Sequence, residues 1–126
     1  MTQLKPRHTI LCRLTIPIIA GGLFSGCGGH SPKVLGSPPE AEASGTVRQL
    51  TQVSSGKPVT LRGEMTEKCP VAGCWFMLKD KTGIVRVDTK ASGFVVSEVP
   101  LHSTVTVTGT VVAGTQPGVA ATGVRY

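Results

Sequence analysis

The fold of this chain is decided by the stretch Cys69-Pro70-Val71-Ala72-Gly73-Cys74-Trp75-Phe76-Met77-Leu78. It places two cysteines on either side of a four-residue turn, and an apolar run that holds the only tryptophan follows. In a β-strand successive side chains point to opposite faces, so Trp75 and Met77 share one face. Cys74 lies on the other face with Phe76 and Leu78. One of these faces has to fill a core, and the stretch therefore predicts a strand of a small β domain.

Four further strands are predicted around this one. Apolar–polar alternation and β-branched runs between turn residues mark them at residues 59–67, 84–88, 104–111 and 119–125. Gly63 and Gly109 would let two of these strands bend, as a small barrel requires. Residues 45–54 carry apolar side chains at i, i+3 and i+6, which predicts one or two helical turns on the barrel end. The expected fold is all-β, a five-stranded OB-fold-like barrel with a short N-terminal helix; an SH3-like barrel or a small sandwich is the alternative.

Residues 1–26 are interpreted as a signal peptide. A basic segment precedes an apolar one at residues 14–24, which has 11 residues, whereas a spanning helix needs about 20. Two small residues then lead into Cys27, and Leu-Phe-Ser-Gly-Cys resembles the bacterial lipobox, although Phe24 stands where leucine is usual. The resemblance implies that Cys27 carries acyl chains such as palmitate and becomes the new N-terminus. The alternative is a plain secretory signal with an incidental cysteine.

Residues 27–44 are expected to be the lipidated cysteine and a flexible linker, because Gly, Ser and Pro dominate them. The folded domain is then expected at residues 45–126. Acyl chains bury methylenes at about 0.8 kcal/mol each, so the anchor would be effectively permanent. The predicted location is the cell envelope, lipid-anchored. Without aspartate at position 28, it would be the outer membrane facing the periplasm in a host with two membranes.

The charge of the chain does not point to nucleic acid. Three of the 13 basic residues and none of the seven acidic ones fall within residues 1–27, which leaves 10 basic against seven acidic groups, a net +3, for residues 28–126. Binding of single strands needs a basic groove and stacked aromatics, and only four aromatic residues follow Cys27. No enzyme is predicted either. Residues 28–126 offer His30 and His102, with no serine–histidine–carboxylate pattern and no glycine-rich phosphate loop.

Cys69 and Cys74 leave three interpretations open. The first is a structural disulfide, because export favours oxidation and a four-residue turn between antiparallel strands can bring the Cα atoms within about 5.5 Å. The second is a soft-metal site in which Met65 and His102 join the thiols, since thiolate and thioether ligands select Cu(I). The third is a redox-active pair. It is disfavoured because neither closer spacing nor a helix N-terminus, which lowers a thiol pKa, is evident in the sequence.

Three motifs stand in order within residues 46–112: Arg62-Gly63-Glu64-Met65, then Cys69…Gly73-Cys74-Trp75, then Gly93-Phe94-Val95-Val96. Together they resemble a family of uncharacterised bacterial periplasmic or lipid-anchored OB-fold domains, for which the Cys…Gly-Cys-Trp element is the most specific part. The barrel layout is more distantly similar to the bacterial stress-related OB-fold family and to the haem chaperone of cytochrome c maturation, whose histidine motif is not evident. The resemblance implies fold and compartment, and no particular activity.

These observations predict a lipid-anchored cell-envelope binding or accessory module without catalytic activity. Besides the membrane, its partner would be an envelope protein or a small ligand, and no cofactor is expected. Trp75 and Met77 form the possible binding face, unless residues 94–96 cover them. The alternative function is copper or haem handling through Cys69 and Cys74.

Overall fold

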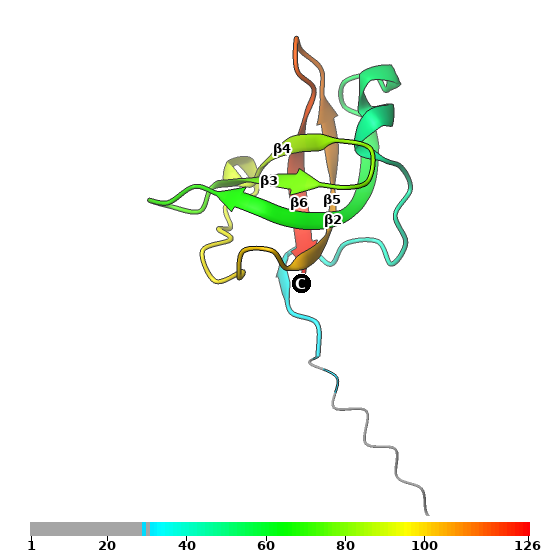
Figure 1. Cartoon of the computed structure of the whole chain (residues 1–126). Coiled ribbons are helices and arrows are strands. Elements are labelled where there is room, and N and C mark those ends of the chain that lie inside the picture. Colours follow the sequence, from blue (N-terminus) through cyan, green and yellow to red (C-terminus); the bar gives the residue numbers. More distant parts are fainter. Residues whose placement is uncertain (1–28, 30) are drawn as a thin grey trace, which may run out of the picture.

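The structure, a computed structural model, describes Gly29 and residues 31–126. The predicted signal peptide and Cys27 lie outside the described residues. Within the described part of the chain, no helix has both the length and the apolar character needed to cross a bilayer. The elements follow in the order β1 (Val34–Gly36), η1 (Val47–Gln52, a 3₁₀ helix), β2 (Pro58–Lys68), β3 (Trp75–Lys79), β4 (Ile84–Asp88), η2 (Lys90–Ser92, also 3₁₀), β5 (Thr104–Val112) and β6 (Gly118–Arg125) (Figure 1).

Five of the strands close into a barrel. β2 pairs with β3, and β3 with β4, as antiparallel neighbours. β4 then pairs in parallel with β6, β6 pairs antiparallel with β5, and β5 returns antiparallel to β2, which completes the ring. The predicted all-β, OB-fold-like barrel is confirmed. Each predicted strand is present, with its ends within one residue of the expected ones, and the predicted helical turns form η1.

The bend in β2 differs from the prediction. The first half of β2 pairs with β5 and its second half with β3, so this single strand serves two neighbours. The ladder to β3 shifts register between Met65 and Glu67, two residues beyond the expected position. Gly63 has another role, because a Cβ there would overlap the carbonyl oxygen of Lys79. The glycine permits close approach of β3, and the bulge follows it.

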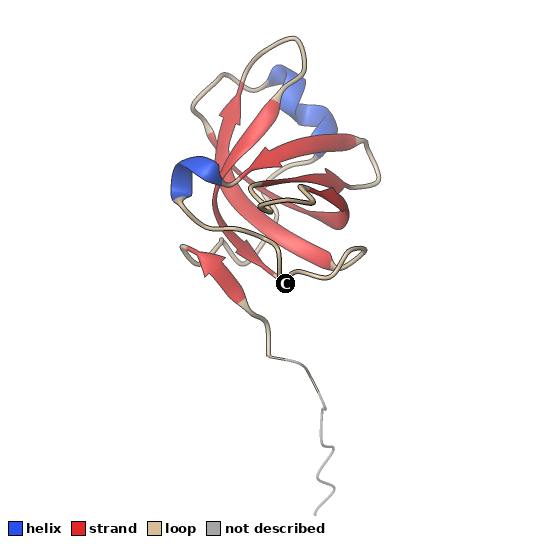
Figure 2. Ribbon diagram, turned by 90° about the vertical axis from the view of Figure 1, so that its left-hand side faces the viewer, coloured by secondary structure: helices blue, strands red, loops and turns tan. Residues whose placement is uncertain are grey.

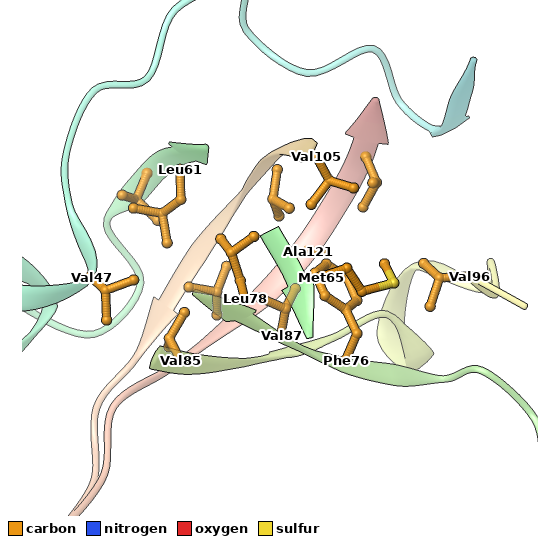
Figure 3. Packing of buried hydrophobic residues seen from close by; sticks show 14 of the residues in the cluster. Val47, Leu61, Met65, Phe76, Leu78, Val85, Val87, Val96, Val105 and Ala121 are labelled. Atoms are coloured by element: carbon orange, nitrogen blue, oxygen red, sulfur yellow. The ribbon is translucent and has the colours of Figure 1, made fainter. Parts of the chain in front are cut away.

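The inward face of β3 is the one that carries Phe76 and Leu78. Both side chains are fully buried and pack in one cluster with Met65 of β2 (Figure 3). The cluster extends from Val47 of η1 at one end of the barrel to Val96, in the connector between η2 and β5, at the other (Figure 3). Full burial of such a side chain stabilises the fold by about 1.5–3 kcal/mol. The outward face of β3 is therefore the one with Trp75 and Met77.

Part of the predicted linker is not free of the barrel. β1 pairs antiparallel with the end of β6, with Val34 opposite Arg125, and Lys33 and Tyr126 exchange two backbone hydrogen bonds of 2.8 and 3.0 Å. Farther along, Pro39 is buried. The physical reason lies in β4, which pairs with only three residues of β6 and leaves the rest of that edge open. Unpaired backbone groups on an edge need partners, and β1 supplies them.

The carboxylate of Asp80 joins the β3–β4 turn to η1. One oxygen accepts the Thr82 N–H and hydroxyl, at 2.7 and 2.6 Å, and the Gly83 N–H at 3.0 Å. The other oxygen accepts the N–H of Val47 at 2.8 Å, from 33 residues away. Partial burial acts to raise the pKa of Asp80, but the hydrogen bonds from Thr82, Val47 and Gly83 outweigh it and lower the pKa below its usual value.

We predict that Asp80→Asn lowers the free energy of unfolding at pH 7 by about 1–3 kcal/mol, because an amide has one acceptor oxygen and no charge. A carboxylate whose pKa is lowered on folding stabilises the protein above the unfolded pKa, about 3.9, and this contribution is lost as pH falls through the lower folded pKa. Urea unfolding at pH 7 and pH 3 should therefore show a smaller difference between variant and wild type at pH 3. Glu98→Gln, at an exposed position, is the control. An equal difference at both pH values would contradict this role of Asp80.

Candidate functional site

A groove of about 980 Å³ lies on the outer face of the barrel. Its walls are η1 on one side and the turn between β5 and β6, with Gln116 and Pro117, on the other. Figures 1 and 2 both show these two elements at the same end of the barrel. Met77 of β3, Ile84 of β4 and Ala120 of β6 line the space between them. A groove of this volume lies in the size range of small-molecule sites.

The groove forms because larger residues of β4 lie opposite small residues of β6. In the parallel ladder Arg86 lies opposite Gly118, and Asp88 lies opposite Ala120. The side chains of Arg86 and Asp88 on β4 therefore stand beside the two small residues Gly118 and Ala120 of β6. At Gly118 a Cβ would come within 3.3 Å of the Arg86 carbonyl oxygen, so a larger residue would crowd this part of the lining.

The groove combines apolar surface with positive charge. Ile84 is 56% exposed, although it is a large aliphatic residue. Three basic residues (Arg48, Arg86 and Lys90) and one acidic residue (Asp88) line the groove. The Asp88 carboxylate also accepts the backbone N–H of Lys90 at 2.9 Å. The groove lining therefore combines exposed apolar side chains with an excess of basic over acidic residues.

Sequence reasoning placed Met77 on a possible binding face, and the structure puts it in the groove lining. Trp75 is also on the outer face but is partly covered, because the Arg86 guanidinium lies over its ring at 4.8 Å from the centroid. Residues 94–96 pack elsewhere: Val96 points into the core (Figure 3), and Phe94 lies near Gly36 of β1.

The sequence did not single out Arg86 or Ile84. Their alternation with buried Val85 and Val87 marks them as outward residues, and it was the one available signal.

The turn from β2 to β3 holds Cys69 and Cys74 at its two ends, both as partly exposed free thiols. The Cys69 N–H donates to the Trp75 carbonyl at 3.0 Å, and the Gly73 N–H donates to the Cys69 carbonyl at 3.2 Å. The backbone N–H groups of Ala72 and Val71, in the turn that follows Cys69, lower the pKa of its thiol to about 7. The turn thus stabilises a thiolate without a long helix. Whether the two cysteines form a disulfide stays a prediction.

The residues expected to bind copper or haem are not gathered around the thiols. The Met65 side chain is fully buried in the core. His102 bonds through Nδ1 to Glu64 Oε1 at 2.7 Å, and its backbone N–H donates to the Met65 carbonyl in the second half of β2. Within residue 29 and residues 31–126, no three His, Cys, Asp or Glu side chains come together as a metal site.

The strand order defines an OB-fold-like barrel, and the groove lies over β4 and β6, with Met77 of β3 at its edge. No protein-family model matches the chain, and no curated protein sequence matches it either. Among solved structures, the hypothetical protein YgiW from E. coli is similar, with 21% sequence identity and a TM-score of 0.50. The similarity covers 68% of this chain and 91% of that one. At this identity the similarity shows the fold alone, and that fold is the OB-fold-like barrel.

Proposed function

We propose that this chain is a lipid-anchored cell-envelope module that binds a ligand in its outer groove and has no catalytic activity. The single observation that carries the binding proposal is the groove itself, which is built from η1, the outer residues of β3 and β4, and the β5–β6 turn. The proposed ligand is an apolar molecule or protein segment with negative charge, since Ile84 and Met77 offer apolar contact and Arg48 and Arg86 offer positive charge.

The proposed anchor is Cys27. β1 begins only seven positions later, at Val34. An extended chain spans at most about 3.6 Å per residue, so the anchored barrel would stay within about 25 Å of the lipid surface. A module held this close would meet ligands at or near the membrane. Copper or haem handling gains no support from the positions of Met65 and His102.

The anchor has a direct test. In full-length protein expressed in a bacterial host, Cys27→Ala should move the protein from the membrane fraction to the soluble fraction, because the acyl attachment site is lost. Fractionation and intact-mass measurement would show the missing lipid. Cys69→Ala is the matched control and should stay with the membrane. A Cys27→Ala protein that remains in the membrane fraction to the wild-type extent would contradict the lipid anchor.

The groove is tested with 8-anilinonaphthalene-1-sulfonate, an apolar anion of the proposed class. We expect the folded protein to bind this probe with an increase in its fluorescence, and Ile84→Glu to weaken binding at least about tenfold, or about 1.4 kcal/mol, by removing apolar contact and adding a negative charge. Leu101→Glu is the matched control, because Leu101 is 46% exposed but lies outside the groove lining. Circular dichroism would verify that both variants are folded.

Two outcomes would contradict a ligand site in the groove. One is the absence of any probe binding to the folded wild-type protein. The other is an equal loss of binding in Ile84→Glu and Leu101→Glu, which would mean that the probe adheres to exposed apolar surface in general.

A further inference from the structure

The turn between β2 and β3 carries two thiols whose surroundings differ, and neither thiol lines the proposed groove. Cys69 precedes the turn, and the backbone N–H groups of Ala72 and Val71 lower the pKa of its thiol to about 7. Such N–H groups stabilise negative charge and so favour the thiolate, which is the nucleophilic form of cysteine. Cys69 is partly exposed, so a reacting molecule has access to it.

Cys74 lies at the other end of the same turn, held by the strand that follows. Its carbonyl accepts the N–H of Thr89 at 2.9 Å, beyond the end of β4. The next residue, Trp75, accepts the Cys69 N–H, which keeps the two ends of the turn side by side. The two cysteines therefore stand at adjoining ends of one ordered turn. The second thiol is the candidate to attack a disulfide formed by Cys69.

The connector between η2 and β5 holds the β2–β3 turn in place through hydrogen bonds. The Gly73 carbonyl accepts the Val96 N–H at 2.8 Å. The Lys68 ammonium donates to the carbonyls of Ser97 and Val99, at 2.8 and 2.6 Å. Gly73 has φ of 63°, and a Cβ at this position would come within 2.8 Å of the Ser97 nitrogen. Only glycine accommodates both the positive φ and the contact, so the backbone that presents Cys69 is well determined.

The surface beside the thiols is apolar. Val71, at the tip of the turn, is 93% exposed, and Val95, on the adjoining connector, is 46% exposed. A small hydrophilic disulfide gains little from such a surface, whereas a protein disulfide flanked by apolar residues can bury it.

We propose that Cys69 and Cys74 form a redox-active dithiol that exchanges with a disulfide of a protein partner. The Cys69 thiolate attacks one sulfur of the partner disulfide, which forms a mixed disulfide and releases the other partner sulfur as a thiolate. Cys74, on losing its proton to solvent, attacks the Cys69 sulfur. The second partner thiolate leaves, and a Cys69–Cys74 disulfide remains. Two electrons pass from the dithiol to the partner, and the released partner thiolates take up protons from solvent. The reverse sequence oxidises a partner dithiol.

The first test compares the full-length variants Cys74→Ser, which keeps Cys69, and Cys69→Ser, which keeps Cys74. Each is reduced and then treated at pH 6.5 with an aromatic disulfide reagent. A pKa of about 7 gives Cys69 a larger thiolate fraction than free cysteine, whose pKa is about 8.5. The lower nucleophilicity of a less basic thiolate offsets part of this gain, so we expect Cys69 to react about fivefold faster than free cysteine. We expect Cys69→Ser to react more slowly than Cys74→Ser.

The second test uses insulin as a protein disulfide. Cys74→Ser should accumulate a mixed disulfide with an insulin chain, visible by mass spectrometry, and Cys69→Ser should not. Reduced wild-type protein should instead lose two hydrogen atoms and retain no insulin chain. Val71→Ser should slow the reaction with insulin and leave the rate with the aromatic reagent unchanged, because it removes apolar surface and no thiol.

Equal reactivity of the two single-cysteine variants would overturn the proposal, and so would a wild-type protein that retains the mixed disulfide. A Cys69–Cys74 disulfide that reduced insulin fails to reduce would also overturn it, because the bond would then be structural. These outcomes are independent of the groove and of the lipid anchor, since neither enters the reaction.

Discussion

The structure depends on β5, which pairs with two strands at once. One edge of β5 bonds to β2 and the other to β6, over seven residue pairs in each case. This double pairing turns a meander into a closed barrel and leaves no free edge on β5. Gly109 makes the close pairing possible, because a Cβ there would overlap the Ala120 carbonyl oxygen. Thr60 and Thr108 reinforce the seam through a hydroxyl contact of 2.8 Å.

The short length of β4 determines two features of the barrel surface, the pairing of β1 with β6 and the groove. β4 pairs with the first three residues of β6 and no further, so the end of β6 is available to β1. At the paired end, Arg86 stands opposite Gly118, and this difference in size opens the groove. β3 begins after the β2–β3 turn. The connector between η2 and β5 holds this turn through the hydrogen bond from Val96 N–H to the Gly73 carbonyl. The groove and the turn with the two cysteines therefore lie on the same closed barrel but share no residues.

Much of this frame could be predicted from the sequence, because strand alternation is a local signal. Val105 and Val107 alternate with threonines, and Phe76 alternates with Met77, so each strand shows its two faces in a few residues. The predicted linker was different: the strand at Val34 depends on an open edge of β6, about 90 residues away. The bulge after Met65 depends in the same way on two partner strands.

The groove and the environment of Cys69 were less predictable, because they depend on contacts that the local sequence pattern does not show. The groove needs Arg86 beside Gly118, and the wall formed by η1 needs Asp80 beside Val47. Neither contact is visible in local sequence. The environment of Cys69 depends on the direction of N–H groups in a turn, which a list of residue types does not give.

The central claim is that β6 closes the barrel between β4 and β5. The most direct measurement is nuclear Overhauser spectroscopy of the labelled protein in solution. The account predicts interstrand contacts between backbone protons around Val87 and Val119 in a parallel pattern, together with antiparallel contacts around Val107 and Val124. The antiparallel contacts without the parallel ones would show an open sheet, and would contradict both the closed barrel and the groove built on it.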